Sequence, residues 1–218
     1  MVKWSYATNQ VGKERNGSMT TILMFVLSYL LGSIPSGVWI GEKIYNIDIR
    51  QHGSGNMGTT NTFRVLGVKA GIAVLAADLL KGTLGASLPY FFDSNLSPMV
   101  VGLAAVLGHT YPLFAQFKGG KAVATSAGVV LAYNPPFFIY CILVFGILLY
   151  FTRMVSLSSL TALVLITISS LFINDWILTA IAFVLTIFIT YRHRENIVRI
   201  KNGTESKIPF GFRYKKEQ

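Results

Sequence analysis

The sequence predicts an all-α integral membrane protein, and three observations lead to that prediction. The chain of 218 residues is 52% hydrophobic and only 13% charged, which is about half the charged fraction of a soluble domain. Its mean hydropathy is +0.54, and its apolar residues fall in runs long enough to cross a bilayer. Its formal net charge is +10, and the basic residues gather between alternate runs. This composition excludes a disordered tail, a coiled coil and an ordinary water-soluble enzyme.

We interpret the apolar runs as seven transmembrane helices in one bundle. A spanning helix needs about 20 residues, within a range of roughly 17–25, and the fourth run is shorter than that. Five or six full spans plus one short buried helix is therefore the alternative. Pro35 and Ser36 are expected to bend the end of the first helix. The predicted helices are Thr21–Ile40, Val68–Phe92, Pro98–Phe117, Val123–Tyr133, Phe137–Phe151, Val155–Phe172 and Trp176–Tyr191.

The two ends of the chain are polar. Residues 1–18 could belong to a signal peptide, but the following apolar run continues past Leu31 without a small-residue cleavage site. Met19 as the natural start is another interpretation. We expect residues 1–18 to be a dispensable extension, residues 19–207 to form the membrane domain, and residues 208–218 to be a basic cytoplasmic tail.

Basic residues predict the orientation. Lys and Arg occur in the connections 41–67, 118–121 and 152–154 and in the tail from 192, whereas 93–97, 134–136 and 173–175 contain none. Because basic connections stay on the cytoplasmic side, the N-terminus is predicted outside and the C-terminus in the cytoplasm. The alternation is complete only if the short fourth helix crosses. It also accounts for the net charge without a nucleic-acid partner.

The first polar segment on the predicted cytoplasmic side runs from His52 to Arg64. Its glycines let backbone N–H groups curl around an anion, and its hydroxyl and amide groups add donors. Arg64 offers a planar fork for a phosphate. A flexible linker would explain the glycines, but the density of donors favours a phosphate site. The candidate ligands are Gly53, Ser54, Gly55, Asn56, Thr60, Asn61 and Arg64.

The second segment precedes the fourth helix. Gly119 and Gly120 can present backbone N–H groups beside Lys121, and a helix N-terminus with a lysine is a ready anion site. A Walker A loop is excluded, because Ala122 stands where Ser or Thr must follow the lysine. Lys121 as an interface anchor is the alternative. His109 is as compatible with packing as with a site.

The third segment follows the seventh helix. If that helix continues, His193 and Asn196 share a face, and Arg199 adds donors to them. A stop region on the cytoplasmic side explains the arginines, but it does not explain His193, Asn196 and Glu205 together.

Asp78 and Lys81, three residues apart within the second helix, are interpreted as a structural pair. The single cysteine, Cys141, lies in an apolar run and is interpreted as a small hydrophobic residue. With one cysteine, three histidines and few carboxylates, we expect neither a metal ion nor a cofactor.

In this order, the three segments resemble the motifs of the bacterial acyl-phosphate:glycerol-3-phosphate acyltransferases of the PlsY type. The similarity extends from about Thr21 to about Lys207, and Thr59 and Ala122 stand where the family often has alanine and glycine. The quoted matches are Gly53-Ser54-Gly55-Asn56-x-Gly58-x-Thr60-Asn61-x-x-Arg64, Gly108-His109-x-Tyr111-Pro112 with Phe117-Lys118-Gly119-Gly120-Lys121, and His193-x-x-Asn196-Ile197-x-Arg199 with Glu205.

The resemblance implies an enzyme of phospholipid biosynthesis in the bacterial cytoplasmic membrane, with its active site facing the cytoplasm. A fatty acyl-phosphate would be the donor and glycerol 3-phosphate the acceptor, with lysophosphatidic acid and inorganic phosphate as products. Motif positions assign Ser54, Lys121, His193 and Asn196 as catalytic and Glu205 as structural. The residues assigned to substrate binding are Gly53, Gly55, Asn56, Thr60, Asn61, Arg64, Gly119, Gly120 and Arg199. More finely, Ser54, Thr60 and Asn61 would hold the donor, and Arg64, Lys121, His193 and Asn196 the phosphates and the acceptor.

An acyl-phosphate is already activated, so such a site needs positioning and charge stabilisation rather than a nucleophile. The general base stays open between His193 and a substrate phosphate oxygen, and the resemblance favours the substrate. A transporter of phosphorylated anions is the alternative function, although it would place polar residues near mid-membrane and often repeat its halves. A lipid-binding scaffold is a third possibility, but it would not need the clustered cations. Neither a His-x4-Asp signature nor a Gly-x-Ser-x-Gly elbow is present.

Overall fold

The computed structural model describes residues 2–214, with side chains from residue 17 onward. All regular elements in this part of the chain are helices. They are α1 (Val2–Gly32), α2 (Ser36–Tyr45), η1 (Ile49–Gln51), α3 (Thr59–Leu66), α4 (Val68–Phe91), α5 (Pro98–Thr110), η2 (Leu113–Ala115), α6 (Val123–Tyr133), α7 (Pro135–Thr152), α8 (Val155–Ser170), α9 (Trp176–Arg192) and α10 (Arg194–Lys201).

Each predicted apolar run contains a helix, but two of the predicted boundaries are wrong. The first run is not one helix: α1 and α2 are separated by residues 33–35 and bent by 41°. Pro35 lacks the N–H that would continue the ladder, so the expected bend is a complete break. The third helix was predicted to reach Phe117, whereas α5 ends at Thr110 and only the short η2 follows.

Three helices are long and apolar enough to cross a membrane: α4, α5 with its continuation to Ala115, and α7. The number rises to five if α1 from Gly17 with α2, and α9 with α10, each form one bent span. The apolar helices α6 and α8 are shorter. Seven crossings therefore remain a prediction.

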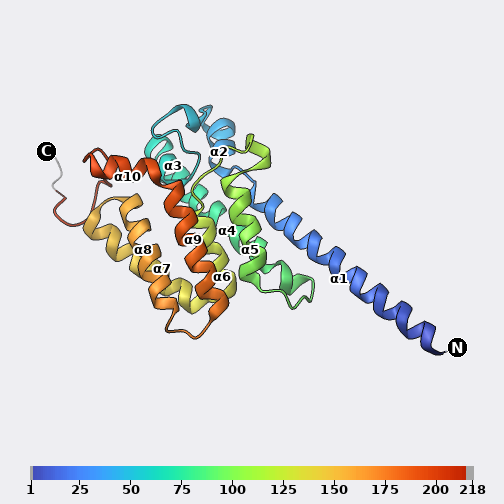
Figure 1. Ribbon diagram of the computed structural model, residues 1–218. Helices are drawn as coiled ribbons and strands as arrows, with labels where there is room; N and C mark the ends of the chain where they lie inside the picture. Colours follow the sequence, from blue (N-terminus) through green and yellow to red (C-terminus); the bar gives the residue numbers. More distant parts are fainter. Residues whose placement is uncertain (1, 215–218) are drawn as a thin grey trace.

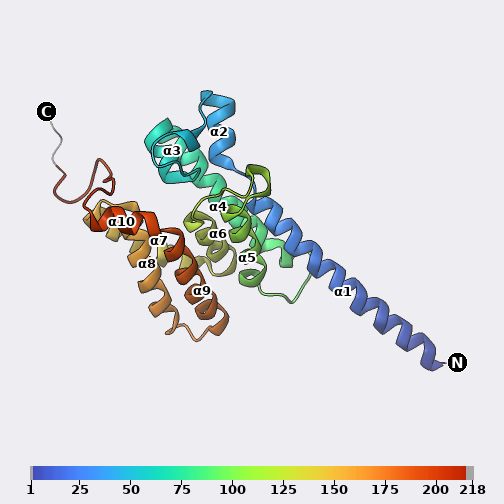
Figure 2. The same cartoon turned by 45° about the horizontal axis from the view of Figure 1, so that its top comes forward.

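The polar segments gather at one end of the bundle. Figure 1 shows α2, α3, α10 and the α5–α6 connection at this end, which we call the motif end, and the α4–α5, α6–α7 and α8–α9 connections at the other. The N-terminal part of α1 stands away from the other helices (Figures 1 and 2). The three predicted motifs thus share one end, as the alternation of basic and non-basic connections along the chain predicts.

Small residues let the central helices approach closely. On α4, a Cβ at Gly82 would overlap the carbonyl oxygen of Thr125; on α6, a Cβ at Gly128 would overlap that of Leu79. Close backbone contact of this kind is typical of helices packed within membranes. The apolar core beside these helices includes Ala86, Met99, Val106, Val129, Leu178 and Ile189.

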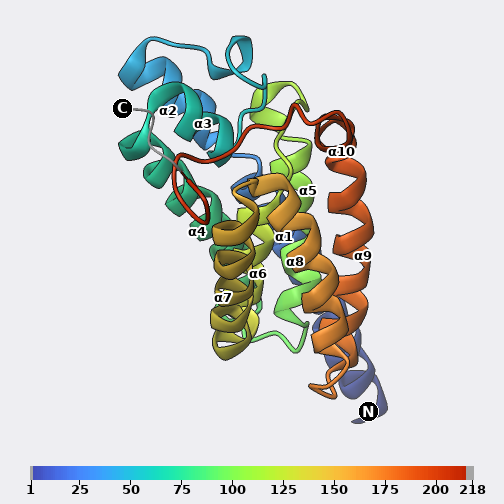
Figure 3. The same cartoon turned by 90° about the vertical axis from the view of Figure 1, so that its left-hand side faces the viewer.

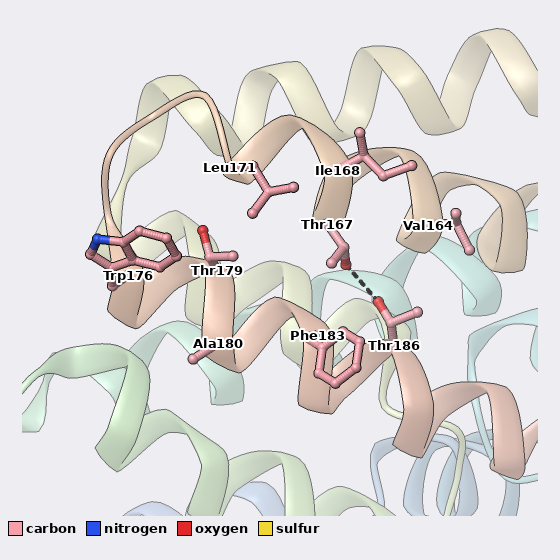
Figure 4. Close-up of a pocket in the computed structure, with 9 residues that line it drawn as sticks. All are labelled: Val164, Thr167, Ile168, Leu171, Trp176, Thr179, Ala180, Phe183 and Thr186. Carbon is pink, nitrogen blue, oxygen red and sulfur yellow. Dashed lines mark hydrogen bonds between the residues drawn. The ribbon is translucent and has the colours of Figure 1, made fainter.

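A groove of about 600 Å³ lies between α8 and α9 (Figure 4). The hydroxyls of Thr167 and Thr186 approach to 2.8 Å across it. It contains none of the residues predicted for the site. Its lining residues are Val164, Thr167, Ile168, Leu171, Trp176, Thr179, Ala180, Phe183 and Thr186.

The predicted ion pair forms inside the bundle. Lys81 Nζ lies 2.8 Å from Asp78 Oδ1, and both residues are almost fully buried, at 4% and 2% exposure. Lys81 also donates to the carbonyl oxygen of Ile34 at 2.9 Å. That carbonyl precedes Pro35, where the helix breaks, so the lysine satisfies an acceptor exposed by the break.

Asp78 joins three further elements to α4. Ser36 Oγ donates to its Oδ1 at 3.2 Å, and Thr59 Oγ1 donates to its Oδ2 at 3.3 Å. His109 Nδ1 lies 3.6 Å from Oδ1. One carboxylate therefore contacts the start of α2, the start of α3 and the end of α5.

We predict that removing either partner of this pair destabilises the protein strongly. Asp78→Asn leaves the Lys81 ammonium without its counter-charge, and Lys81→Met leaves the carboxylate alone; each should cost about 3–5 kcal/mol. The double variant removes both charges and should be less destabilised than either single variant. Thermal unfolding in detergent measures this.

Asp93→Asn is the control, because Asp93 is exposed at a turn with φ of 47° that asparagine tolerates. Single variants at Asp78 and Lys81 that unfold at the wild-type temperature would contradict the structural role of the pair.

Candidate functional site

The second and third motifs meet through a chain of polar contacts. Lys121 Nζ donates to Asn196 Oδ1. Asn196 Nδ2 donates in turn to Glu205 Oε1 at 2.7 Å, and Arg199 Nε lies 2.7 Å from Glu205 Oε2. These four predicted residues thus form one network at the motif end, although Lys121 and Glu205 are 84 positions apart in the sequence.

Ser156 is a member of this network that the sequence analysis missed. Its Oγ donates to Glu205 Oε1 at 2.7 Å from the first turn of α8. In sequence, Ser156 is one small residue in an apolar run, which is as typical of helix packing as of a site. Only its position beside the basic 152–154 connection marked it as lying at the motif end.

The network holds a cation and a carboxylate close together. Burial lowers the pKa of Lys121 to about 8, and the positive charge of Arg199 acts in the same direction, against the charge of Glu205. Burial favours the neutral form of Glu205, but hydrogen bonds from Ser156, Asn196 and Arg199 outweigh it and lower the pKa of this carboxyl. Lys121 is therefore a poorly hydrated cation that an additional anion would stabilise.

His193 lies at a bend rather than on a continuing helix. The seventh helix ends at Arg192, and α9 and α10 are bent by 63°, so the face that His193 and Asn196 would share on one helix does not exist. The bend nevertheless buries both, at 4% and 7% exposure. His193 Nδ1 lies 2.8 Å from the carbonyl oxygen of Ile189. Because a carbonyl only accepts, Nδ1 carries the hydrogen and Nε2 is the nitrogen able to exchange a proton.

The two predicted phosphate-binding glycines pack against His109. A Cβ at Gly120 would overlap the imidazole ring of His109, and one at Gly119 would overlap the His109 carbonyl oxygen. The Gly120 N–H donates to that carbonyl at 3.1 Å, so it is already used in this structure. Arg192 Nη2 lies 3.4 Å from the carbonyl oxygens of both glycines. The pair thus shapes the approach to Lys121.

The start of α6 offers donors beside Lys121. Ala122 precedes the helix in a left-handed conformation, with φ of 59°, and provides no side-chain cap. The first N–H groups of α6 point out of its N-terminus, where the helix dipole favours an anion. In the described part of the chain, the buried hydroxyls of Thr125 and Ser126 in this first turn also lack a hydrogen-bond partner.

In the first motif, Asn61 builds the loop. Its Oδ1 accepts the N–H of Ser54 at 2.9 Å, and its Nδ2 donates to the carbonyl oxygens of Ile49 and His52 at 2.9 and 3.0 Å. Gly53, with φ of 61°, leaves no room for a Cβ against Asn61. Both ends of the Asn61 amide are thus occupied within its own loop, and its role as a substrate ligand stays a prediction.

The remaining members of the first motif divide in the same way. Asn56 Oδ1 accepts the N–H of Gly58 at 2.9 Å and closes a turn. Ser54, Gly55, Thr60 and Arg64 are exposed at the motif end. The Arg64 side chain makes no hydrogen bond or ion pair within residues 17–214, so its guanidinium is available to a ligand.

Within the described residues, the polar side chains of the first motif reach the other motifs through Asp78, and Met57 of the same segment packs in one apolar cluster with Ala115 of η2. No hydrogen bond or ion pair within residues 17–214 joins the side chains of the first motif to Lys121, His193 or Asn196. Thr59 contacts Asp78, Asp78 lies beside His109, and His109 packs on Gly120. The relative position of the two halves of the site therefore depends on the buried pair of α4.

A metal site is not formed by the described residues: they contain no group of three or more His, Cys, Asp or Glu side chains able to hold an ion. The chemistry of the motif end is instead that of basic side chains, amides and helix N–H groups. Such a donor set binds phosphates and other oxyanions.

Comparison with known proteins identifies relatives along nearly the whole chain. The family model described as glycerol-3-phosphate acyltransferase matches residues 22–203. A glycerol-3-phosphate acyltransferase of Enterococcus faecalis is 59% identical over 209 residues, covering 91% of this chain and 96% of the relative. The protein of the same name from Lactiplantibacillus plantarum is 52% identical over 203 residues, covering 92% and 98%.

Two crystal structures of PlsY (YgiH), an integral membrane glycerol 3-phosphate acyltransferase, share the fold. The glycerol 3-phosphate form has a TM-score of 0.80 and 39% sequence identity, and covers 86% of this chain and 94% of that one. The lysophosphatidic acid form has a TM-score of 0.78 and 38% identity, with the same coverage. Together with the apolar helices, these matches identify a membrane protein, and the chain belongs to the glycerol-3-phosphate acyltransferase family.

Proposed function

We propose that this protein transfers a fatty acyl group from an acyl-phosphate to a hydroxyl of glycerol 3-phosphate, with release of lysophosphatidic acid and inorganic phosphate. The observation that carries the proposal is the network of Lys121, Asn196, Arg199 and Glu205 beside the start of α6. The related PlsY structures in a glycerol 3-phosphate form and a lysophosphatidic acid form support the acceptor and the product.

Both substrates carry phosphate, so the site must hold two anions close together. Lys121 and the N–H groups of α6 suit one phosphate, and Lys121 is already half-buried and partly desolvated before a phosphate binds. Arg64, exposed and unpaired within the described residues, suits the second, together with Ser54 and Thr60 of the same motif. Asn196 and Glu205 orient Lys121.

The reaction needs no covalent acyl-enzyme. The acceptor hydroxyl oxygen attacks the acyl carbonyl carbon, the bond between that carbon and the phosphate oxygen breaks, and phosphate leaves with the electron pair. The hydroxyl proton passes to a phosphate oxygen of the substrates in the substrate-assisted route. Cations and N–H donors stabilise the charge that develops on the oxygens. His193 Nε2 is the base on the protein in the alternative route.

We place the motif end at the cytoplasmic face of the bacterial plasma membrane, with seven crossings and the N-terminus outside. The distribution of Lys and Arg supports this orientation. The phosphates then bind at the aqueous face, while the acyl chain remains in the apolar phase between helices.

The donor is tested with purified protein in detergent or lipid vesicles. Given glycerol 3-phosphate and palmitoyl-phosphate, the protein should release lysophosphatidic acid and inorganic phosphate in equal amounts, whereas palmitoyl-CoA should give no product. Turnover with palmitoyl-CoA alone would overturn the donor assignment. Folded protein inactive with both donors would favour the transport of phosphorylated anions.

Lys121→Ala should lower kcat/KM for glycerol 3-phosphate by about 100-fold or more, because it removes a half-buried charge from the proposed phosphate site. Lys201→Ala is the matched control, since Lys201 is exposed on α10, and it should retain wild-type kinetics. Circular dichroism and thermal unfolding verify that both variants fold. A fully active Lys121→Ala variant would exclude this phosphate site.

The rate should also fall at alkaline pH. The pKa of Lys121 is about 8 in the free protein, so the protonated, phosphate-binding form is lost as the pH rises through that value. A phosphate with a second pKa near 6 is already a dianion there. The kcat/KM should therefore decline above about pH 8, since it reports groups of the free enzyme.

Lys121→Arg should remove this decline or move it to higher pH, because arginine stays charged. Donor hydrolysis without enzyme is subtracted at each pH. Identical profiles for the wild type and Lys121→Arg would show that another group controls the decline.

A further inference from the structure

The chain beyond α10 returns to the bundle instead of extending away from it. In Figure 3 it leaves α10 and crosses the ends of α8 and α7. The Ile208 N–H donates to the Arg153 carbonyl oxygen at 2.8 Å, and Arg153 Nη2 donates back to the Ile208 carbonyl oxygen at 3.0 Å. The Phe212 N–H donates to the carbonyl oxygen of Tyr150 at 2.8 Å. We call residues 204–214 the C-terminal strap.

Ring contacts hold the same segment. The rings of Phe151 and Phe212 lie 5.7 Å apart, and the Arg153 guanidinium lies 4.8 Å from the centre of the Tyr214 ring. Arg153 itself ends α7 in a left-handed conformation, with φ of 59°. The corner between α7 and α8 thus contacts the strap with the side chains of Phe151 and Arg153 and with two backbone carbonyl oxygens.

Glu205 lies between the two attachments of the strap. On one side, the Thr204 N–H donates to the Arg199 carbonyl oxygen at 2.8 Å, and on the other, Ile208 is bonded to Arg153. The Glu205 side chain is only 6% exposed. Its carboxylate accepts hydrogen bonds from Ser156, Asn196 and Arg199, each at 2.7 Å. Asn196 also accepts a hydrogen bond from Lys121.

We propose that the C-terminal strap is a positioning element of the site: its attachment to the α7–α8 corner keeps Glu205 against Asn196, and Asn196 orients Lys121. This inference rests on the proposed acyl transfer. The match to the family model ends at residue 203, and the attachments of the strap to the α7–α8 corner, at Ile208 and Phe212, lie beyond it. Without Ile208 and Phe212 in place, Glu205 would be followed by a free chain end, and holding its carboxylate would cost conformational entropy.

The strap contains basic residues, and a purely electrostatic attraction of substrate is the competing explanation. Arg213 serves to separate the two, because its guanidinium lies over the Phe212 ring at 5.1 Å and bonds to no carbonyl oxygen of the α7–α8 corner. Arg213→Gln removes one charge and keeps the backbone bonds of the strap.

The experiment compares five variants with the wild type: a chain truncated after Lys207, Arg153→Gly, Arg213→Gln, Glu205→Gln, and the truncation combined with Glu205→Gln. Glycine at 153 retains the left-handed backbone and the carbonyl acceptor but loses the guanidinium. Truncation should lower kcat/KM for glycerol 3-phosphate about tenfold, as expected when a catalytic group is misplaced, and Arg153→Gly should lower it in the same direction. Arg213→Gln should match the wild type.

The combined variant is decisive. If the strap acts through Glu205, truncation in the Glu205→Gln background should change kcat/KM by less than about twofold, because coupled positions are not additive. The proposal would be overturned if the fold-losses of kcat/KM for truncation and for Glu205→Gln multiplied in the combined variant. It would also be overturned if the truncated chain kept the wild-type kcat/KM, or if Arg213→Gln lost as much as the truncated chain.

Amide hydrogen exchange tests the strap without turnover. Truncation should raise exchange in residues 196–206 and leave α4 and α6 unchanged, and equal protection in both proteins would overturn the proposal. An inactive wild type with this exchange result would instead mean that the strap orders Glu205 but that acyl transfer from an acyl-phosphate is wrong.

Discussion

Asp78 and Lys81 bring opposite charges into an apolar bundle, where either charge alone would be expensive to bury. The structure satisfies both: Lys81 bonds to Asp78 and to the carbonyl of Ile34, and Asp78 accepts from Ser36 and Thr59. These bonds join α4 to the break between α1 and α2 and to the start of α3. They also bring Asp78 beside His109, so the first motif is held relative to the second by a pair that lies outside both.

At the motif end, as around Asp78, each charged side chain of the network is held by hydrogen-bonded partners. Lys121 is half-buried, and its partial desolvation lowers its pKa, so it holds its proton less firmly than a surface lysine. Here the amide of Asn196 accepts from it, and Glu205 holds that amide in place. Glu205 in turn is satisfied by Ser156 and Arg199. The proposed phosphate site thus contains a partly desolvated ammonium group, whose charged form a bound anion would stabilise. Its hydrogen-bonded partners determine where that anion binds.

Residues of the motifs differ in what they do, and sequence alone did not separate them. Gly120 and Asn61 were expected to contribute donors to a ligand, whereas one packs on His109 and the other joins three points of its own loop. Ser156 was overlooked because Ser158 and Ser159 follow it in the same apolar run, and nothing in their spacing shows which serine faces the site. The partners of a side chain come from segments that are distant in the sequence, so the local spacing of residues cannot predict them.

The sequence by itself determined the class of fold, the approximate position of every apolar helix, the clustering of three polar segments at one end, and the family, because hydrophobic runs and long motifs are properties of the order of residues. Only the tertiary structure decided that Pro35 breaks the first helix fully, that the chain bends at His193, and that the tail beyond Lys207 returns to the α7–α8 corner. It also decided that Lys121, Asn196, Glu205 and Ser156 form one network. The physical reason is that these features arise from contacts between distant segments, which are selected by the packing of the whole bundle.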